Sequence, residues 1–130
     1  SSLGVADGLS KAGIDERAVA LFGDSSFFHT HIPALCNAVY NESDILIVVI
    51  DNLTTATSGM QPNPGVGRNA FGREAPRLSI EGIARACGVD NVQRIRHPEN
   101  SAHARKVFTE ELKRNRLSMV IVETECTPPD

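Results

Sequence analysis

The sequence predicts one α/β domain, in which helices cover both faces of an open, mainly parallel β-sheet. Segments typical of strands and of helices alternate along the chain, which is the pattern of parallel sheets with crossover helices. The run Ile45–Ile50 (ILIVVI) contains six consecutive branched residues without polar alternation, as in strands that are buried on both faces. The chain has 130 residues, 41% of them hydrophobic, which is enough for a single core.

The N-terminal part is predicted to contain a helix, a strand and a second helix before that run. Small and apolar residues recur at helical spacing over Ser2–Ala12, and Gly13 is a normal helix terminator. We expect a strand over Arg17–Phe22. A helix is expected over Thr30–Tyr40, with its first residue as the cap and Pro33 tolerated in the first turn.

After the buried run, residues 53–78 contain four glycines, three prolines and no periodicity. Loops of this length in a small domain are usually functional or disordered. Regular structure is predicted again beyond the loop, as helix, strand, helix and strand. These elements are expected over Ser79–Cys87, Val92–Arg96, Ser101–Arg114 and Leu117–Val122.

Composition excludes several classes of protein. The formal net charge is -3 and the 13 Lys and Arg residues are scattered, so we expect no nucleic-acid partner. No apolar run is long enough to span a membrane, and no signal segment opens the chain. The cysteines Cys36, Cys87 and Cys126 form no CxxC pair, so local spacing builds neither a zinc site nor an iron-sulfur cluster. We expect a cytoplasmic protein, and the Ser1 start without an initiator Met favours a fragment of a longer chain.

Oxygen-bearing side chains follow two of the predicted strands. Asp24 follows the strand that ends at Phe22, and Asn52 follows the strand that ends at Ile50. Ligands of open α/β sheets bind beyond the carboxyl ends of the strands, so we expect both side chains at one rim of the sheet. Together with the backbone carbonyl of Thr54 they offer three hard oxygen ligands of low total charge, which suit Mg²⁺ bound with a phosphate.

Donors for a phosphate are predicted at the same place. Backbone N–H groups and hydroxyls lie near a helix start, where anions are favoured. The N–H groups are those of Ser25 and Ser26, and the hydroxyls are those of Thr54, Thr55, Thr57 and Ser58. Neither a Walker A nor a GxGxxG sequence is present, and the glycine-rich segment 65–72 follows no strand, so we interpret it as plain loop.

These residues carry a resemblance to a known family. The sequence Gly23-Asp24-Ser25, followed after 26 positions by Asn52, is similar to the thiamine diphosphate (TPP) motif, GDG followed by Asn. The longer string GDSSFFHTHIPALCNAVYN…VVIDNLTTATSGMQPNPG resembles the TPP-binding domain of the indolepyruvate:ferredoxin oxidoreductase alpha subunits. The resemblance covers residues 1 to about 66, and the sequence beyond Gly72 is generic α/β.

The resemblance implies the diphosphate-binding domain of the TPP fold, lacking part of its N-terminus. It implies that Asp24, Asn52 and the Thr54 carbonyl bind Mg²⁺. It also implies that the diphosphate is held by Gly23, Ser25, Thr57 and Ser58. The activity implied is oxidative decarboxylation of indolepyruvate or other aryl 2-oxoacids to the acyl-CoA, with ferredoxin as electron acceptor.

The resemblance further implies several partners. A pyrimidine-binding domain of the same or a neighbouring chain would complete the cofactor site, and a second, beta- or gamma-type subunit would complete the enzyme. The iron-sulfur clusters would lie in the parent protein, outside this segment. We therefore expect the 130 residues alone to be inactive and to bind Mg²⁺-TPP weakly.

Two histidines near the motif carry separate expectations. His29, beside Phe27 and Phe28, either orients substrate or transfers a proton, or is simply packed and hydrogen-bonded. His31 stands where a small residue is expected from the resemblance, and its bulk is predicted to narrow the site.

Two other functions remain open from the sequence. One is a TPP-dependent 2-oxoacid decarboxylase that releases an aldehyde without iron-sulfur partners. The other is a non-catalytic α/β binding domain in which Asp24 and Asn52 have structural roles only.

Overall fold

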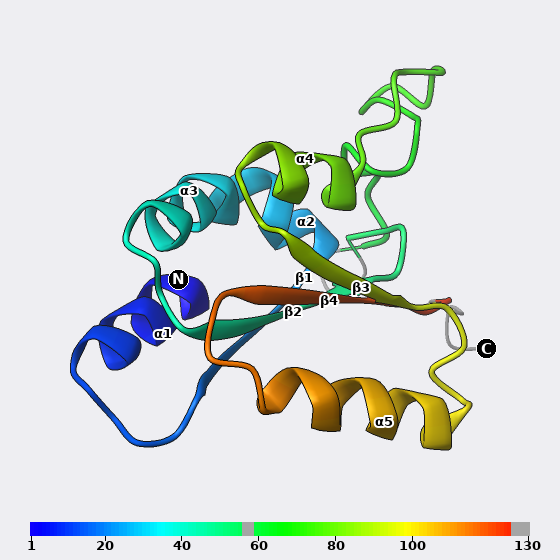
Figure 1. The fold of residues 1–130 in the computed structure, drawn as a ribbon. Coiled ribbons are helices and arrows are strands. Elements are labelled where there is room, and N and C mark those ends of the chain that lie inside the picture. The colour runs from blue at the N-terminus through cyan, green and yellow to red at the C-terminus, as the bar shows by residue number, and fades with distance from the viewer. Residues whose placement is uncertain (56–58, 126–130) are drawn as a thin grey trace.

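A four-stranded parallel sheet forms the centre of the domain, as the sequence predicts. The computed structural model describes residues 1–55 and 59–125. The strand order is β1-β2-β4-β3, and each neighbouring pair is parallel (Figure 1). The strands are β1 (Ala18–Gly23), β2 (Ile45–Asp51), β3 (Asn91–Ile95) and β4 (Ser118–Glu123).

Helices cover both faces of this sheet. Three helices pack on one face around a core that includes Leu3, Leu35 and Ile47, and α5 covers the other face, where Val48 and Val120 meet Phe108 (Figure 1). The three helices are α1 (Ser2–Lys11), α3 (Ile32–Tyr40) and α4 (Ile80–Ala86), and α5 runs over Ser101–Leu112. Burial on both faces accounts for the unbroken apolar run of β2.

The helix after β1 begins six residues earlier than the sequence predicts. A short α2 (Asp24–Ser26) starts directly after Gly23, and a π-helical turn, η1 (Phe27–His31), leads into α3. Thr30 is therefore not the helix cap; its hydroxyl donates a hydrogen bond to the Ser26 carbonyl at 2.8 Å. The widened turn precedes Pro33, whose missing N–H is incompatible with a regular α-helical ladder.

The other predicted elements are present, with ends that differ by one or two residues. Ser79 caps α4 as predicted, because its hydroxyl accepts a hydrogen bond from the Gly82 N–H at 3.0 Å. α5 is capped by Asn100, whose side-chain oxygen accepts a hydrogen bond from the His103 N–H at 3.3 Å. None of the helices in the described residues is long and apolar enough to cross a membrane.

The described part of the long loop has no helix or extended strand. Two isolated antiparallel bridges hold it, Thr55 with Gln61 and Arg68 with Glu74. The loop leaves the sheet at the carboxyl ends of the strands and rises beside α4 (Figure 1). This course places loop residues next to the first turn after β1, which is the predicted site.

Candidate functional site

The strand register places Asp24 and Asn52 at the same edge of the sheet. Gly23 pairs with Ile50 across β1 and β2. Asp24 follows Gly23 directly, and Asn52 lies two residues beyond Ile50. The predicted juxtaposition of the two segments is therefore present, at the carboxyl ends of adjacent parallel strands.

Asp24 is a buried carboxylate without a cationic partner among the described residues. Its side chain accepts hydrogen bonds from the Ser25 N–H at 2.8 Å and from the Asn63 amide at 2.9 Å, one on each oxygen. The residue is only 3% exposed. Burial raises the pKa of the neighbouring Asp51 carboxyl, and the negative charge of Asp24 raises it further. Two neighbouring carboxylates give this edge of the sheet a negative potential, which favours positively charged groups.

The loop residue Asn63 was not predicted as part of the site. Its amide donates to Asp24 while its oxygen accepts the Gly65 N–H at 2.9 Å. Gly65 fits here only because it lacks a side chain, since a Cβ would lie 2.9 Å from Cε2 of Phe28 and 3.2 Å from Oδ1 of Asn63. The QPNPG segment is visible in the sequence, but only the fold shows that it supports the carboxylate.

Asn52 and Thr54 form a tight turn at the end of β2. The Thr54 N–H donates to the Asn52 side-chain oxygen at 3.3 Å, and Leu53 between them has a left-handed φ of 59°. Non-glycine residues adopt this conformation at an energetic cost, and such residues gather at functional sites. The turn fixes the orientation of the Asn52 side chain and the Thr54 backbone at the end of β2, on the sheet edge where Asp24 follows β1.

The predicted phosphate donors have different surroundings. The Ser25 N–H already donates to the Asp24 carboxylate, so this group positions the carboxylate in the present arrangement. Ser26 is exposed, and the Thr54 hydroxyl donates to the Gln61 carbonyl at 3.5 Å. The same carbonyl accepts the backbone N–H of Thr55 at 2.9 Å. Thr57 and Ser58 lie outside the described residues.

The two histidines of the π-helical turn face different surroundings. His29 is exposed, and no described residue hydrogen-bonds to its ring, so it is not the packed and hydrogen-bonded residue of the second expectation. Its role toward substrate stays a prediction. His31 does not narrow the site as predicted: it is buried and its ring stacks on Phe22, with centroids 3.8 Å apart. Its Nδ1 lies 2.9 Å from the Ser26 carbonyl, and its Nε2 lies 3.5 Å from the Ser2 hydroxyl. His31 therefore joins the turn to α1.

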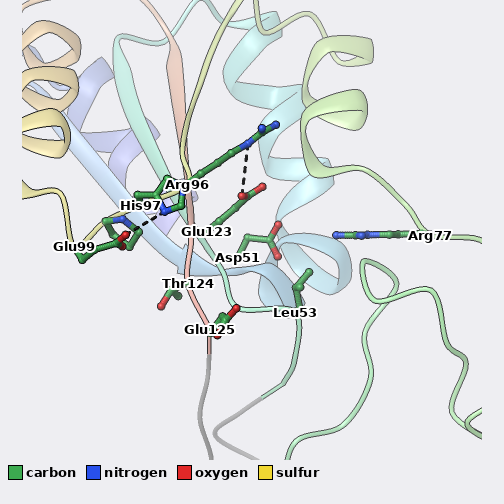
Figure 2. Close-up of a pocket in the computed structure, with 10 residues that line it drawn as sticks. Asp51, Leu53, Arg77, Arg96, His97, Glu99, Glu123, Thr124 and Glu125 are labelled. Atoms are coloured by element: carbon green, nitrogen blue, oxygen red, sulfur yellow. Dashed lines mark hydrogen bonds and ion pairs between the residues drawn. The ribbon is translucent and has the colours of Figure 1, made fainter.

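A cavity of about 510 Å³ opens at the same edge of the sheet, beyond the ends of β2, β3 and β4. In Figure 2, Asp51 and Glu123 lie in the middle of the group of lining residues, and the Arg77 side chain points toward Asp51 from the loop. Acidic residues outnumber arginines in its wall. The lining residues are Asp51, Leu53, Arg77, Arg96, His97, Pro98, Glu99, Glu123, Thr124 and Glu125.

Arg94 connects the wall of this cavity to α4. Its guanidinium pairs with Glu123 and lies 3.5 Å from Glu81 and 4.0 Å from Asp51. The Asp51 charge is thus partly compensated by Arg94, whereas no cation of residues 1–55 or 59–125 pairs with Asp24. No feature of the sequence indicated Arg94, because the residues that it joins come from separate elements.

Comparison with known proteins identifies the family of domains to which this sheet and its carboxyl edge belong. A sequence profile described as "Thiamine pyrophosphate enzyme, C-terminal TPP binding domain" matches residues 1–122. The chain belongs to this family. The similarity runs through almost the whole chain, well beyond the first 66 residues to which the motifs point.

Individual relatives agree with this assignment. The chain is 42% identical, over 126 residues, to the indolepyruvate oxidoreductase subunit IorA of Methanothermobacter marburgensis, so the resemblance predicted from the motifs is confirmed. That alignment covers 97% of this chain and 20% of the relative, so the chain spans about one fifth of the relative's length.

Solved structures show the same fold. The 2-oxoglutarate:ferredoxin oxidoreductase of Magnetococcus marinus superposes with a TM-score of 0.86 at 15% identity, over 95% of this chain and 44% of that one. The benzoylformate decarboxylase of Polynucleobacter necessarius superposes with a TM-score of 0.68 at 19% identity, over 98% of this chain and 24% of that one. The predicted α/β fold with helices on both faces of a parallel sheet is therefore confirmed.

The residues at the edge fit a divalent cation. Each oxygen of the Asp24 carboxylate accepts one N–H, and a carboxylate oxygen has room for a further partner. Asn52 adds an amide oxygen from the next strand. This donor set is hard, oxygen-rich and of low charge, as Mg²⁺ requires.

Proposed function

We propose that this chain binds TPP through Mg²⁺ held by Asp24, Asn52 and the backbone carbonyl of Thr54. The observation that carries the proposal is the buried Asp24 carboxylate, which has no cationic partner among the described residues. Membership of the TPP-binding family supports the identity of the ligand.

The chain's own residues bind and orient the cofactor in this proposal. The last residue of β1, Gly23, caps the helix that contains Ser25 and Ser26. The diphosphate is proposed to bind to these three residues, together with Thr57 and Ser58. Asn63 holds the Asp24 carboxylate in place through its 2.9 Å hydrogen bond. When bound, TPP supplies an electron sink for the decarboxylation of a 2-oxoacid. His29 remains a proposed substrate-positioning or proton-transfer residue.

We propose that the chain is one domain of a 2-oxoacid:ferredoxin oxidoreductase that acts on indolepyruvate or another aryl 2-oxoacid. The name of the relative at 42% identity supports the substrate class. The proposed partners are a pyrimidine-binding domain, a second subunit, ferredoxin and CoA, with iron-sulfur clusters located outside this segment. A cytoplasmic location is proposed from the composition.

The two alternative functions have weaker support. The decarboxylase shares only its fold with this chain, at 19% identity. A purely structural role for Asp24 requires a buried carboxylate to be retained without a cation, which is costly.

A binding measurement on the full-length protein tests the proposal. Asp24→Asn keeps the size of the side chain and removes its charge. We expect TPP affinity in the presence of Mg²⁺ to fall at least about 100-fold, equivalent to about 2.7 kcal/mol, in isothermal titration calorimetry. The control is Asp90→Asn, an exposed aspartate in the turn before β3, which should bind like the wild type. Equal affinity of the two variants would contradict the proposal.

A further inference from the structure

Two cysteines that are 51 positions apart in the sequence meet on the surface of the domain. The Sγ atoms of Cys36, on α3, and Cys87, directly after α4, are 3.7 Å apart. Both are free thiols. The sequence gives no sign of this contact, because no CxxC spacing is present and the two residues belong to different helices.

Packing of the two helices holds the thiols together. α3 and α4 lie side by side on the same face of the sheet (Figure 1). A Cβ placed at Gly88 would lie 3.0 Å from Cγ1 of Val39, so the end of α4 lies very close to α3. Val39 and Cys87 both pack against the same hydrophobic core. The two sulfurs are therefore close because the packing of α3 against the end of α4 holds their backbones together, and not only because the side chains can rotate.

The two thiols differ in their access to solvent. Cys36 is exposed and Cys87 is partly buried. Burial raises the pKa of Cys87, and the neighbouring Cys36 raises it further. A soluble oxidant therefore reaches Cys36 first, while the neighbouring Cys87 is still a protonated, reduced thiol.

We propose that Cys36 and Cys87 are a reversible oxidation site, at which a peroxide produces a disulfide between α3 and α4. The peroxide oxidises Cys36 to a sulfenic acid and releases one water. The Cys87 sulfur then attacks the Cys36 sulfur, and the sulfenic oxygen leaves as a second water. Two thiols lose two hydrogens and two electrons in total, and the peroxide accepts them. An external dithiol reverses the reaction by exchange.

The geometry permits this bond. The sulfurs must approach from 3.7 Å to about 2.05 Å, which rotation of the two side chains can provide. The bond would join α3, which continues from the turn that carries Asp24, to α4, which follows the loop that carries Asn63. Oxidation would therefore restrain both segments that support the candidate cofactor site, without using any of its residues.

The proposal is tested on the full-length protein treated with hydrogen peroxide and then alkylated and digested without reduction. We expect mass spectrometry to find a Cys36–Cys87 linked peptide in the wild type and in Cys126→Ser, and its loss on treatment with dithiothreitol. The linked peptide should be absent from Cys36→Ser and Cys87→Ser. The proposal is overturned if both thiols stay alkylatable in the wild type, or if each pairs with some other cysteine.

Thermal unfolding gives an independent readout. A bond that closes a long segment restrains the unfolded chain, so the oxidised wild type should melt at least about 5 °C above the reduced protein. Cys36→Ser should show no such rise. A linked peptide without any rise in melting temperature would overturn the inferred restraint on the two helices.

Discussion

At the amino ends of the strands a buried cation is paired with an anion, whereas at the carboxyl ends the buried Asp24 carboxylate interacts unfavourably with the Asp51 carboxylate. Arg17, just before β1, has a side chain that is only 7% exposed, and its Nε lies 3.0 Å from Asp44. The same guanidinium donates to the carbonyls of Ile45, Glu111 and Arg116. One arginine thus joins β1 to the starts of β2 and β4.

The buried Glu111 carboxylate at the amino end also has hydrogen-bond and ion-pair partners. Glu111 is 2% exposed, and its carboxylate accepts from Asn91 and pairs with Arg114 at 3.1 Å. At the carboxyl end, Asp24 receives only neutral N–H donors from the described residues. A buried charge by itself therefore does not mark a ligand site. A buried charge that no described residue compensates is the better indicator of a ligand site.

The largest expected effect lies at the amino end. Arg17→Met keeps the length of the side chain but removes every donor, leaving Asp44 and the part-buried carbonyls of Ile45 and Glu111 without their partner. We expect the free energy of unfolding, measured with urea, to fall by about 4 kcal/mol. Arg105→Met, on the exposed side of α5, is the matched control and should change stability by less than about 0.5 kcal/mol. A small loss at Arg17 would break the contrast between the two ends.

Substitution of Asn63 tests how far the carboxyl end depends on this loop residue. Asn63→Ala deletes the donor to Asp24 and the acceptor for the Gly65 N–H, both buried. We expect a loss of about 2 kcal/mol in urea unfolding and a weaker affinity for TPP in calorimetry. The matched control is Asn69→Ala, whose side chain accepts two N–H groups in an exposed part of the same loop. Equal losses in the two variants would show that the carboxyl end has no special dependence on Asn63.

A steric change at Gly65 should have a somewhat smaller effect. In Gly65→Ala the new methyl group meets Phe28 and Asn63 at 2.9 Å and 3.2 Å. Because the Phe28 ring can shift, we expect a loss of about 1.5 kcal/mol in thermal or urea unfolding. Gly8→Ala in α1, where nothing lies within 4 Å of the added Cβ, should be neutral or slightly stabilising. Wild-type stability of Gly65→Ala would mean that the loop does not pack on Phe28.

The smallest expected effect concerns the pH dependence of stability. The folded state raises the pKa of Asp51 above its ordinary value of 3.8, so ionisation of Asp51 destabilises the fold. Asp51→Asn should therefore stabilise the cofactor-free protein at pH 7, by less than about 1 kcal/mol because Arg94 partly compensates the charge.

This gain should shrink as the pH falls through the raised pKa, and it should vanish below the ordinary value, where both states are protonated. Urea unfolding of the wild type and Asp51→Asn at a series of pH values measures the difference. A gain that increased toward acid pH would show that the Asp51 carboxylate is stabilised by its surroundings, and the contrast with the amino end would fail.

Much of the site was predictable because it depends on local sequence next to buried strands. The apolar run of β2 fixes where its strand ends, and the residues that follow must lie at the carboxyl edge of a parallel sheet. Asp24 and Asn52 could be placed together on this ground alone. The predicted start of the helix after β1 was wrong because Thr30 and Pro33 are good local signals for a helix start. Nothing in the local sequence indicates the π-helical turn that precedes Pro33.

The succession of helices and strands along the chain, the fold class and the family could be read from the sequence, since each follows from short-range patterns and motifs. Only the tertiary structure decided which distant residues meet: Asn63 at Asp24, Arg94 at Glu123 and Glu81, and Cys36 at Cys87. The physical reason is that these contacts depend on how the loop and the helices pack over the sheet, and hydrophobic packing is set by the shape of the whole core rather than by neighbours in sequence.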